Sequence, residues 1–554
     1  MKKIYTTLFC LFLLKNFLTA QHYIRVWTSL NQDSTTGFFA FNDMSVDKNG
    51  NTYIAGYQTD PGDEYYEKHF YISKINANGD LEWKKNFNKK KDSIDEAIAI
   101  AVDADGYVYV TGARIDTFCN ICTYNTRISD IITMKYNSKG KRIWLNRYHD
   151  SIYILASPSD IGLHPDGTIL ITGNETWYNP VTGRDENGLL LQKIDNNGAT
   201  KWVKKMKDVV TSSGCFDGKG EIIVAGASDI DHIYQTRKPM VLKFNRNGKL
   251  LWSNVYNEYN KNGNFSFVGC DSIDNIYVNG QTDTLAFYNN PKIITVKYSP
   301  AGAMQWFRKE IDHTTSMLRY QGDFKVDAAG NSYVTGFLSK TSVDDDWITS
   351  KYDNAGKKKW TVTFNDSLNG SDRPNGLVID RSGNVFVTGH VFNKGGYAIG
   401  VVGYDKKGQV IGSDIYGRKK ANAFPVGIGV DKNNNVYVGG ALGFYNSPYP
   451  ASVVLKYGKK EFTAIAKAPS IQELKLFPNP VGSSLNLIFS TTAAGGNYKL
   501  VISDMNGNTV LSRQLGKSEK QLNASINVQE LKHGVYTAAI TDGINSVSKT
   551  FIKE

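Results

Sequence analysis

Histidine, cysteine and proline are all scarce in this sequence, whose 554 residues include 8 His, 5 Cys and 14 Pro. No histidine lies in an HExxH pattern or another metal-ligand spacing, and no GxSxG nucleophile element is present. The Asp-rich segments also lack the ligand set of a calcium-binding loop, which ends in a bidentate Glu. We therefore predict no catalytic residues, no metal site and no cofactor, and a protein that is not an enzyme.

Long apolar runs are missing after the N-terminus, which predicts that the mature chain has no transmembrane span. Dense basic blocks are missing too, although Lys and Arg outnumber Asp and Glu by 64 to 53 and the formal charge is +11. Scattered positive charge is typical of a solvated basic surface. We therefore predict no nucleic-acid partner.

The first twenty residues have the layout of a secretory signal peptide. Lys2 and Lys3 precede an apolar stretch over 4–14, and small residues end the segment at Ala20. Cys10 lies inside the apolar stretch and not at its end, which argues against a lipid anchor. We predict a signal peptide over residues 1–20 and export of the rest.

A ten-residue phrase, "DKNGNTYIAG" at Asp47, returns along the chain. Its eight copies begin 51 to 61 residues apart, at Asp47, Asp103, His164, Asp217, Asp271, Asp327, Asp380 and Asp431. Asp and Gly in the phrase are typical of a tight hairpin turn between two short strands. A period of this length in strand-rich sequence predicts stacked β units or propeller blades.

The sequence pattern within each repeated unit predicts four antiparallel strands. The third strand ends in Lys-aromatic pairs such as Lys351-Tyr352, and the fourth carries a Trp in most units. The last unit stops after Lys456-Tyr457, whereas the mature N-terminus begins with an orphan strand containing Trp27. We therefore predict an all-β, eight-bladed β-propeller over 21–458, in which the N-terminal strand pairs with 453–457 and completes the last blade.

These units resemble the bacterial β-propeller repeats called SBBP, in which a GNVYVTG segment is followed by a KYD…G…W segment. The similar segments here are SGNVFVTG at 382–389 and KYDNAGKKKW at 351–360. The resemblance implies an architecture and not an activity.

The repeat ends before a predicted linker over 459–472, and a separate strand-rich segment follows the linker. We expect a small Ig-like β-sandwich over 473–554. This segment resembles the type A C-terminal sorting domain of Bacteroidetes type IX secretion (T9SS) cargo, which implies handling by that machinery and a secreted or outer-membrane surface-attached protein. The resemblance rests on three motifs, whose residues are Phe477, Pro478, Asn479, Pro480, Asp504, Gly507, Gly534, Val535 and Tyr536.

Aromatic residues in the long connections after the second strands are the candidate ligand contacts, because loops on a rigid scaffold commonly carry function. They are Tyr65, Tyr66, Tyr124, Trp177, Tyr178 and Tyr234. Packing of these loops on themselves is the alternative. The acidic segment VDDDW at 343–347 is either a solvated loop or a cation site.

Four cysteines remain after the signal peptide. Cys119 and Cys122 form a CxxC that predicts a local disulfide or two free thiols rather than a zinc site. Cys215 and Cys270 lie in similar parts of successive repeats and are expected to be small buried side chains.

The function predicted from the sequence is binding of an extracellular carbohydrate or protein by a secreted or cell-surface propeller. Two alternatives stay open. One is a polysaccharide-directed hydrolase or lyase with its site at a channel mouth, and the other is a structural or gliding-associated surface component.

Overall fold

The computed structural model has two compact units, residues 1–460 and 461–554. The residues that the structure describes are 23–32, 39–59, 68–87, 93–116, 128–150, 154–179, 181, 183–231, 236–257, 262–282, 292–309, 317–339, 344–365, 370–393, 396–417, 422–443, 451–459, 471–491, 497–504, 509–517, 521–541 and 546–554. The predicted signal peptide and almost all of the predicted linker lie outside them.

The described residues form 39 strands and no helix, so the all-β prediction is confirmed. Since they include no helix, they also include none long and apolar enough to cross a membrane.

The N-terminal unit is built from a recurring set of four antiparallel strands, which we call a repeat. Within a repeat, strands that follow one another in the chain are neighbours in the sheet. Parallel bridges between the third strand of one repeat and the first strand of the next also join the first three repeats into one twelve-stranded sheet. The first two repeats are β2 (Phe39–Val46), β3 (Thr52–Thr59), β4 (Lys68–Ile75) and β5 (Leu81–Phe87), and then β6 (Ser93–Val102), β7 (Val108–Asp116), β8 (Ile128–Tyr136) and β9 (Arg142–Tyr148). The next three are β10 (Ile154–Leu163), β11 (Ile169–Asn179), β12 (Arg184–Ile194) and β13 (Thr200–Lys207); β14 (Val209–Phe216), β15 (Ile222–Asp231), β16 (Thr236–Phe244) and β17 (Leu250–Val255); and β18 (Gly263–Cys270), β19 (Ile276–Thr282), β20 (Lys292–Tyr298) and β21 (Met304–Lys309). Two more follow, β22 (Met317–Val326), β23 (Ser332–Ser339), β24 (Asp345–Tyr352) and β25 (Lys358–Phe364), and then β26 (Arg373–Ile379), β27 (Val385–Asn393), β28 (Gly396–Tyr404) and β29 (Val410–Tyr416).

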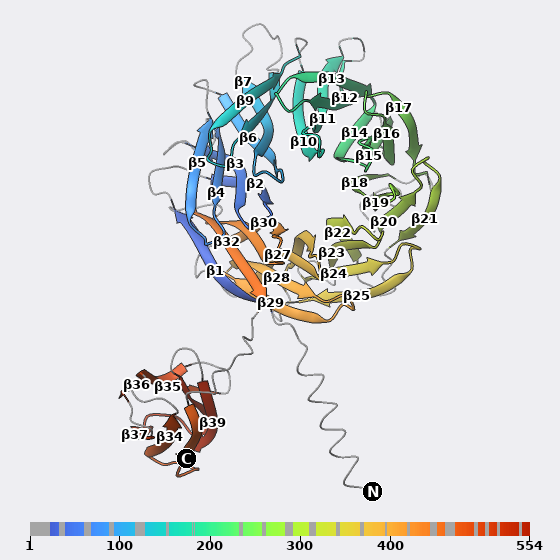
Figure 1. The fold of residues 1–554 in the computed structure, drawn as a ribbon. Helices are drawn as coiled ribbons and strands as arrows, with labels where there is room; N and C mark the ends of the chain where they lie inside the picture. The colour runs from blue at the N-terminus through green and yellow to red at the C-terminus, as the bar shows by residue number, and fades with distance from the viewer. Residues whose placement is uncertain are drawn as a thin grey trace. The chain divides into compact units, whose positions relative to one another are not determined.

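The last repeat takes its fourth strand from the other end of the chain. It consists of β30 (Ala423–Val430), β31 (Val436–Leu442), β32 (Ala451–Lys459) and β1 (Tyr23–Gln32). β1 runs antiparallel to β32, with Trp27 opposite Lys456 and Thr28 opposite Leu455, and the two strands lie side by side in Figure 1. The predicted pairing of the N-terminal strand is therefore confirmed.

The repeats stand around a common centre in a propeller-like arrangement, with the first strand of each repeat innermost (Figure 1). Neighbouring sheets share clusters of buried apolar side chains. The first and last repeats are joined in the same way, because Met44 and Ile54 pack with Tyr437 and Val454 in one cluster. Apolar faces of the sheets are thus covered by the sheets beside them.

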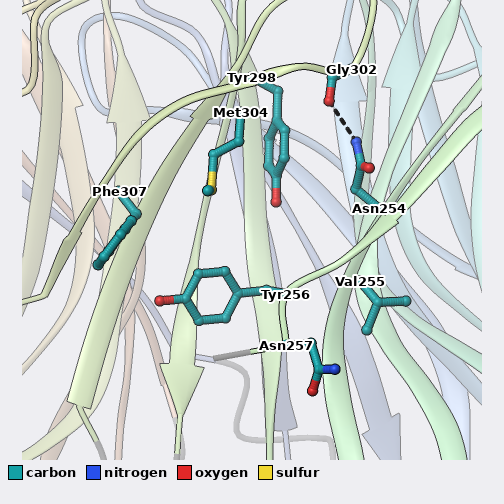
Figure 2. Close-up of a pocket in the computed structure, with 8 residues that line it drawn as sticks. All are labelled: Asn254, Val255, Tyr256, Asn257, Tyr298, Gly302, Met304 and Phe307. Carbon is teal, nitrogen blue, oxygen red and sulfur yellow. Dashed lines mark hydrogen bonds between the residues drawn. The ribbon is translucent and has the colours of Figure 1, made fainter. Parts of the chain in front are cut away.

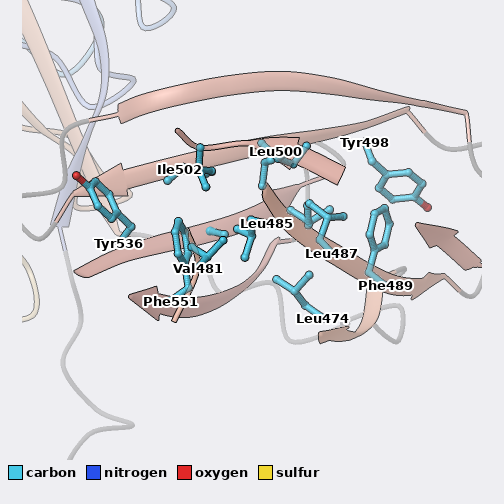
Figure 3. Close-up of a cluster of buried hydrophobic side chains, with 14 residues drawn as sticks. Leu474, Val481, Leu485, Leu487, Phe489, Tyr498, Leu500, Ile502, Tyr536 and Phe551 are labelled. Carbon is cyan, nitrogen blue, oxygen red and sulfur yellow. The ribbon is translucent and has the colours of Figure 1, made fainter. Parts of the chain in front are cut away.

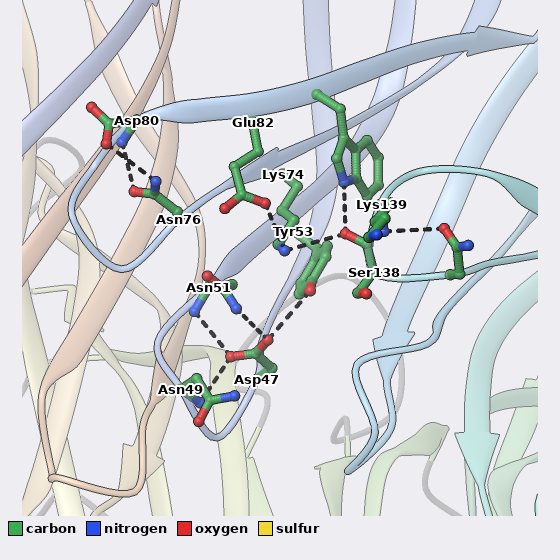
Figure 4. A network of polar contacts seen from close by, with 12 residues as sticks. Asp47, Asn49, Asn51, Tyr53, Lys74, Asn76, Asp80, Glu82, Ser138 and Lys139 are labelled. Atoms are coloured by element: carbon green, nitrogen blue, oxygen red, sulfur yellow. Dashed lines mark hydrogen bonds and ion pairs between the residues drawn. The ribbon is translucent and has the colours of Figure 1, made fainter.

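The repeated phrase forms the turn between the first two strands, as Figure 4 shows for the first repeat. Asp47 Oδ1 accepts hydrogen bonds from the backbone N–H groups of Asn49 and Asn51, at 2.9 and 3.0 Å. Its Oδ2 accepts from Asn51 Nδ2 at 2.7 Å and from the Tyr53 hydroxyl at 3.3 Å. Gly50 has φ +86°, which favours glycine. The Asp therefore satisfies turn donors, and this accounts for its recurrence without a metal.

A Lys and a Trp join each of several repeats to the next by meeting on one carbonyl oxygen. Lys74 Nζ and Trp83 Nε1 both donate to the Ser138 carbonyl oxygen, at 3.2 and 3.0 Å, in a turn of the following repeat (Figure 4). Across the seam between the chain ends, Lys456 Nζ and Trp27 Nε1 donate to the Ala77 carbonyl oxygen, both at 3.2 Å. The contact at the seam, between the last repeat and the first, therefore uses the same pair of hydrogen bonds as the joint between the first two repeats.

The β26–β29 repeat lacks both residues of this joint, and the structure provides the reason. Gly403 and Gly412 stand where Lys351 and Trp360 stand in the preceding repeat. The outer strand of the last repeat is β1, so no turn links it to β32 and no equivalent carbonyl exists to accept the bonds. A Cβ on Gly412 would lie 2.5 Å from the Tyr23 carbonyl oxygen, so β1 takes up the space that a Trp would need.

Three inner strands carry a carboxylate that bridges to the next repeat. In β2, a register shift precedes Asp43, whose carboxylate accepts from the backbone N–H groups of Met44 at 2.8 Å and Ile100 at 2.9 Å. Asp160 and Asp323 follow similar shifts and make comparable bridges. Burial, opposed by these backbone hydrogen bonds, raises the pKa of Asp43 to about 7.

This raised pKa predicts an unusual pH dependence of stability. A carboxyl whose pKa is higher in the folded than in the unfolded state stabilises the fold below its unfolded pKa and loses that contribution as pH rises through the folded pKa. We expect the Asp43 contribution to fall between pH 4 and 7, and Asp43→Asn to remove this part of the slope. Urea unfolding at several pH values, followed by Trp fluorescence, measures it, because all nine Trp lie in the N-terminal unit. Equal slopes for both proteins would contradict the prediction.

The C-terminal unit consists of two sheets around one core. A three-stranded sheet has the order β33-β34-β37 and a four-stranded sheet the order β36-β35-β38-β39. Leu487, Phe489, Leu500 and Ile540 are among the fully buried residues of the shared cluster, part of which Figure 3 shows. The strands are β33 (Ile471–Phe477), β34 (Ser484–Thr491), β35 (Asn497–Asp504), β36 (Thr509–Lys517), β37 (Gln521–Asn527), β38 (Gly534–Thr541) and β39 (Ser546–Lys553).

Candidate ligand pocket and sorting domain

The six aromatic residues predicted as ligand contacts fall into two groups. Tyr65, Tyr66, Tyr124 and Tyr234 lie outside the described residues. Trp177 and Tyr178 lie in β11, not in a loop, because β11 and β12 continue their pairing as far as Asn179 and Arg184. The expectation of a loop was therefore wrong for these two residues, although whether they contact a ligand stays a prediction.

Trp177 packs against its own hairpin. It is opposite Glu186 on β12, and a Cβ on Gly188 would lie 2.9 Å from its ring. Glu186 in turn accepts from Asn179 Nδ2 at 2.6 Å and pairs with Lys207 Nζ at 2.9 Å. The surroundings of Trp177 favour the alternative of packing within the hairpin.

One carboxylate of the acidic segment, that of Asp345, is buried at the start of β24 and is held by side chains of β23 and of the neighbouring repeat. Asp345 Oδ2 accepts from Arg373 Nε at 2.9 Å and from Ser371 Oγ at 2.8 Å. Its other oxygen accepts from Ser339 Oγ at 2.5 Å. Among the described residues, no group of three or more His, Cys, Asp or Glu side chains is arranged to hold a metal ion. Asp345 thus has protein partners that a cation would have to displace.

A cavity of about 410 Å³ lies between the β14–β17 and β18–β21 sheets. Figure 2 shows Tyr298, Met304 and Tyr256 around a common space, with Phe307 to one side. The Tyr256 ring centroid is 6.1 Å from that of Phe307, in an edge-to-face arrangement. The lining residues are Asn254, Val255, Tyr256, Asn257, Tyr298, Gly302, Met304 and Phe307.

The pocket combines buried aromatic rings with an exposed apolar rim. Tyr256 and Tyr298 are buried, at 7% and 3% exposure, whereas Met304 and Phe307 are 54% and 37% exposed. Burial raises the pKa of Tyr298 to about 12, so its hydroxyl is neutral at physiological pH. Among the residues that the structure describes, the lining is aromatic, aliphatic and amide with no charged side chain. This chemistry suits a ligand with both an apolar face and hydroxyl groups.

Local hydrogen bonds hold the pocket walls. Asn254 Nδ2 donates to the Gly302 carbonyl oxygen at 2.7 Å, which fixes β17 against the turn before β21. Gly302 has φ +89°, and a Cβ there would lie 2.9 Å from the Trp252 ring, so the turn requires glycine. The backbone N–H of Tyr256 donates to the Pro239 carbonyl oxygen at 2.8 Å, which positions the residue just after β17.

Sequence reasoning missed this pocket, although one signal was present. Phe307 follows the fourth-strand Trp306, a position that holds Lys84, Leu145 or Ser253 in other repeats. An aromatic residue there is unusual among these repeats. Its partner Tyr256 belongs to the preceding repeat, and only the packing of the two sheets brings them together.

The sorting motif residues gather around the last strand of the C-terminal unit. Asn479 Oδ1 accepts from the backbone N–H of Ile552 at 2.8 Å. Val481, which follows the FPNP segment, exchanges backbone hydrogen bonds with the tail, donating to the Ile552 carbonyl oxygen at 2.8 Å and accepting from Glu554 N at 3.0 Å. Phe477 itself is 45% exposed, so the segment fixes the chain end while its aromatic ring faces solvent.

The other two motifs lie on adjacent strands of the four-stranded sheet. Asp504 at the end of β35 is opposite Tyr536 on β38. The Tyr536 ring stacks on Phe551 of β39, with centroids 5.7 Å apart, and its hydroxyl donates to the Lys532 carbonyl oxygen at 2.9 Å. Gly534 and Val535 begin β38, and Gly507 lies outside the described residues. The described parts of the motifs are thus structural supports of one sheet.

Comparison with protein-family models identifies this unit. Residues 475–554 match the model described as the secretion system C-terminal sorting domain. The C-terminal unit is a secretion-system sorting domain. The sorting domain marks the protein for export by the type IX secretion system, and the protein is therefore secreted or held at the cell surface.

Several solved structures are similar to the chain at low identity. The β-propeller domain of the Trilobed protease from Pyrococcus furiosus, described as having an open velcro topology, is 11% identical, with a TM-score of 0.38, over 65% of this chain and 92% of that chain. An ulvan lyase bound to a GlcA–Rha3S saccharide is 11% identical, with a TM-score of 0.41, over 76% and 95%. A Dyadobacter fermentans protein of unknown function is 9% identical, with a TM-score of 0.36, over 79% and 99%. Structural similarities with TM-scores this low carry no argument about function. No curated protein sequence matches the chain.

Proposed function

We propose that residues 21–458 form an eight-bladed β-propeller that binds extracellular carbohydrate and carries out no chemistry of its own. The observation that carries the binding proposal is the aromatic and amide-lined pocket of about 410 Å³. Tyr256 and Phe307 offer apolar ring faces, and Tyr298 and Asn257 offer polar groups. Pyranose rings have an apolar face and a rim of hydroxyl groups, so this lining is complementary to them.

Support for the blade count comes from the repeats. Seven consecutive sets of four antiparallel strands are followed by β30–β32, which β1 completes. The kinship with SBBP repeats and the Ig-like character of the C-terminal sandwich stay predictions. A protein that the sorting domain delivers to the cell exterior meets polysaccharides there, which fits the proposed ligand class.

The test is a glycan array probed with the full mature chain, followed by calorimetry on any glycan bound. The double variant Met304→Ala/Phe307→Ala removes the exposed apolar side of the pocket while leaving the buried tyrosines in place. We expect it to weaken binding about tenfold or more, since losing two such contacts costs on the order of 1.4 kcal/mol or more. The matched control is Ile143→Ala, which removes a 50% exposed apolar side chain from another outer strand.

Equal affinity of the double variant and the control would overturn the assignment of the pocket. Incubation of the bound glycan with the protein tests the enzymatic alternative, because new reducing ends or unsaturated sugars would indicate a hydrolase or lyase. Absence of any bound glycan, together with specific capture of a surface protein, would favour a protein partner or the structural alternative instead.

A further inference from the structure

Two cysteines of neighbouring repeats face each other across the joint that forms the pocket. Cys215 on β14 and Cys270 on β18 have their sulfur atoms 3.9 Å apart. Both are free thiols and half-buried, which corrects the expectation of buried side chains. Together with Trp252 and Val268, they are partly buried and pack against one apolar cluster.

The register of the two strands explains why the thiols meet. Cys215 lies two residues before its turn residue Asp217, whereas Cys270 lies one residue before Asp271. Successive residues of a strand point to opposite faces, so one thiol faces the following repeat and the other faces the preceding repeat.

Other joints place different residues at the same two positions. A Cβ on Gly162 would contact Phe216, and one on Gly429 would contact Val46. In each of these joints a glycine faces a larger apolar side chain. At the joint between β14 and β18 both positions are cysteine, so this joint alone among the three can be crosslinked by its own side chains.

We propose that Cys215 and Cys270 form a disulfide bond in the exported protein. The sorting domain shows that the chain leaves the cytoplasm, and export takes it through the oxidising periplasm. A disulfide needs a sulfur–sulfur distance of about 2.05 Å. The two sulfur atoms are 3.9 Å apart on facing strands, so formation of the bond requires them to approach by about 1.9 Å.

The reaction is a thiol–disulfide exchange with a disulfide-bearing oxidant of the periplasm. One thiolate attacks a sulfur of the oxidant and forms a mixed disulfide, which releases one oxidant thiol. The second cysteine then attacks the mixed disulfide, and the other oxidant sulfur leaves as a thiol. The two cysteines lose two protons and two electrons in all, and the oxidant disulfide is reduced to two thiols.

Such a bond would link the two sheets that line the pocket. It closes a chain loop between residues 55 positions apart and restricts the unfolded chain, which is the main way that a disulfide stabilises a fold. The proposed bond does not depend on carbohydrate binding, because the two thiols face each other whatever the pocket binds.

Peptide mapping of the natural secreted protein tests the bond directly. The full chain is denatured without reductant, alkylated and digested, and the peptides are identified by mass. We expect a crosslinked peptide pair containing Cys215 and Cys270 that separates on reduction. Alkylation of both residues before reduction would overturn the proposal, as would a bond from either residue to another cysteine. This measurement needs no variant and does not depend on the folding of one.

A stability measurement provides an independent check. We expect a reducing agent to lower the melting temperature of the wild-type N-terminal unit by about 3–10 °C, and to leave that of Cys215→Ser/Cys270→Ser unchanged. The matched control is Cys119→Ser/Cys122→Ser, which keeps the proposed bond and is expected to respond to the reductant as the wild type does. A response that disappears in this control, and persists in the first variant, would contradict the assignment.

Discussion

Deleting residues 23–32 is expected to abolish the cooperative unfolding transition of the N-terminal unit. These residues form β1, whose ladder with β32 extends from Tyr23 opposite Lys459 to Gln32 opposite Ala451. The deletion removes Tyr23, which is 6% exposed, and the Trp27 contact with the first repeat. Each large buried side chain contributes about 3–5 kcal/mol, against a typical net stability of about 5–15 kcal/mol. Urea unfolding followed by Trp fluorescence measures the loss.

The matched control moves the strand instead of removing it. Since Tyr23 lies opposite Lys459 in an antiparallel pair, a short turn inserted after Lys459 can lead directly into residues 23–32, with the sorting domain following. This permuted chain keeps every contact of β1 and is expected to recover a cooperative transition close to that of the wild type. If the deletion variant instead unfolds at the same urea concentration as the wild type, β1 is dispensable and the proposed closure of the ring is wrong.

Deleting residues 471–554 is expected to stop release of the protein while leaving the N-terminal unit folded. The two units have separate cores, and the deletion removes the whole region that matches the sorting domain. We expect the shortened protein to accumulate in the periplasm, with only a small fraction of the wild-type amount at the cell surface or in the medium. Cell fractionation with immunoblotting measures the distribution, and Trp fluorescence of the retained protein checks its folding.

A point variant separates the role of the motif from that of the whole domain. Asn479→Ala removes the side-chain oxygen that accepts from Ile552 N and is expected to cost about 1 kcal/mol, with a partial export defect. The matched control is Gln529→Ala, at an exposed position of the same unit. Wild-type export of the shortened chain would show that another segment carries the signal.

Much of the N-terminal unit could be predicted because its signals are local. The turn at Asp47 depends on residues within six positions, where one carboxylate satisfies nearby backbone and side-chain donors. Strand alternation and positive-φ glycines are local as well. Counting strands is sufficient to place the N-terminal strand that contains Trp27. This strand lacks the first three strands of a repeat, and the last repeat at the other end of the chain lacks only its fourth.

The candidate sites could not be predicted in the same way because they depend on which repeats touch. Tyr256 and Phe307 are 6.1 Å apart in space but lie in different repeats. The sequence around Trp177 predicts a loop, whereas pairing across the hairpin extends both β11 and β12 through this region. Cross-strand and sheet-to-sheet contacts decide such features, and composition does not report them.

By itself, the sequence determined the repeat, its four-strand pattern, the partner of the N-terminal strand and the sorting motifs, because each follows from residues close together in the chain or from their count. Only the tertiary structure decided which carbonyl each Lys and Trp meets, why Gly403 and Gly412 replace them in the repeat before the seam, and that Cys215 faces Cys270. The physical reason is that these contacts join residues far apart in the chain, about fifty positions between most neighbouring repeats and 379 positions for Lys456 and Ala77. Their geometry exists only after neighbouring sheets have packed.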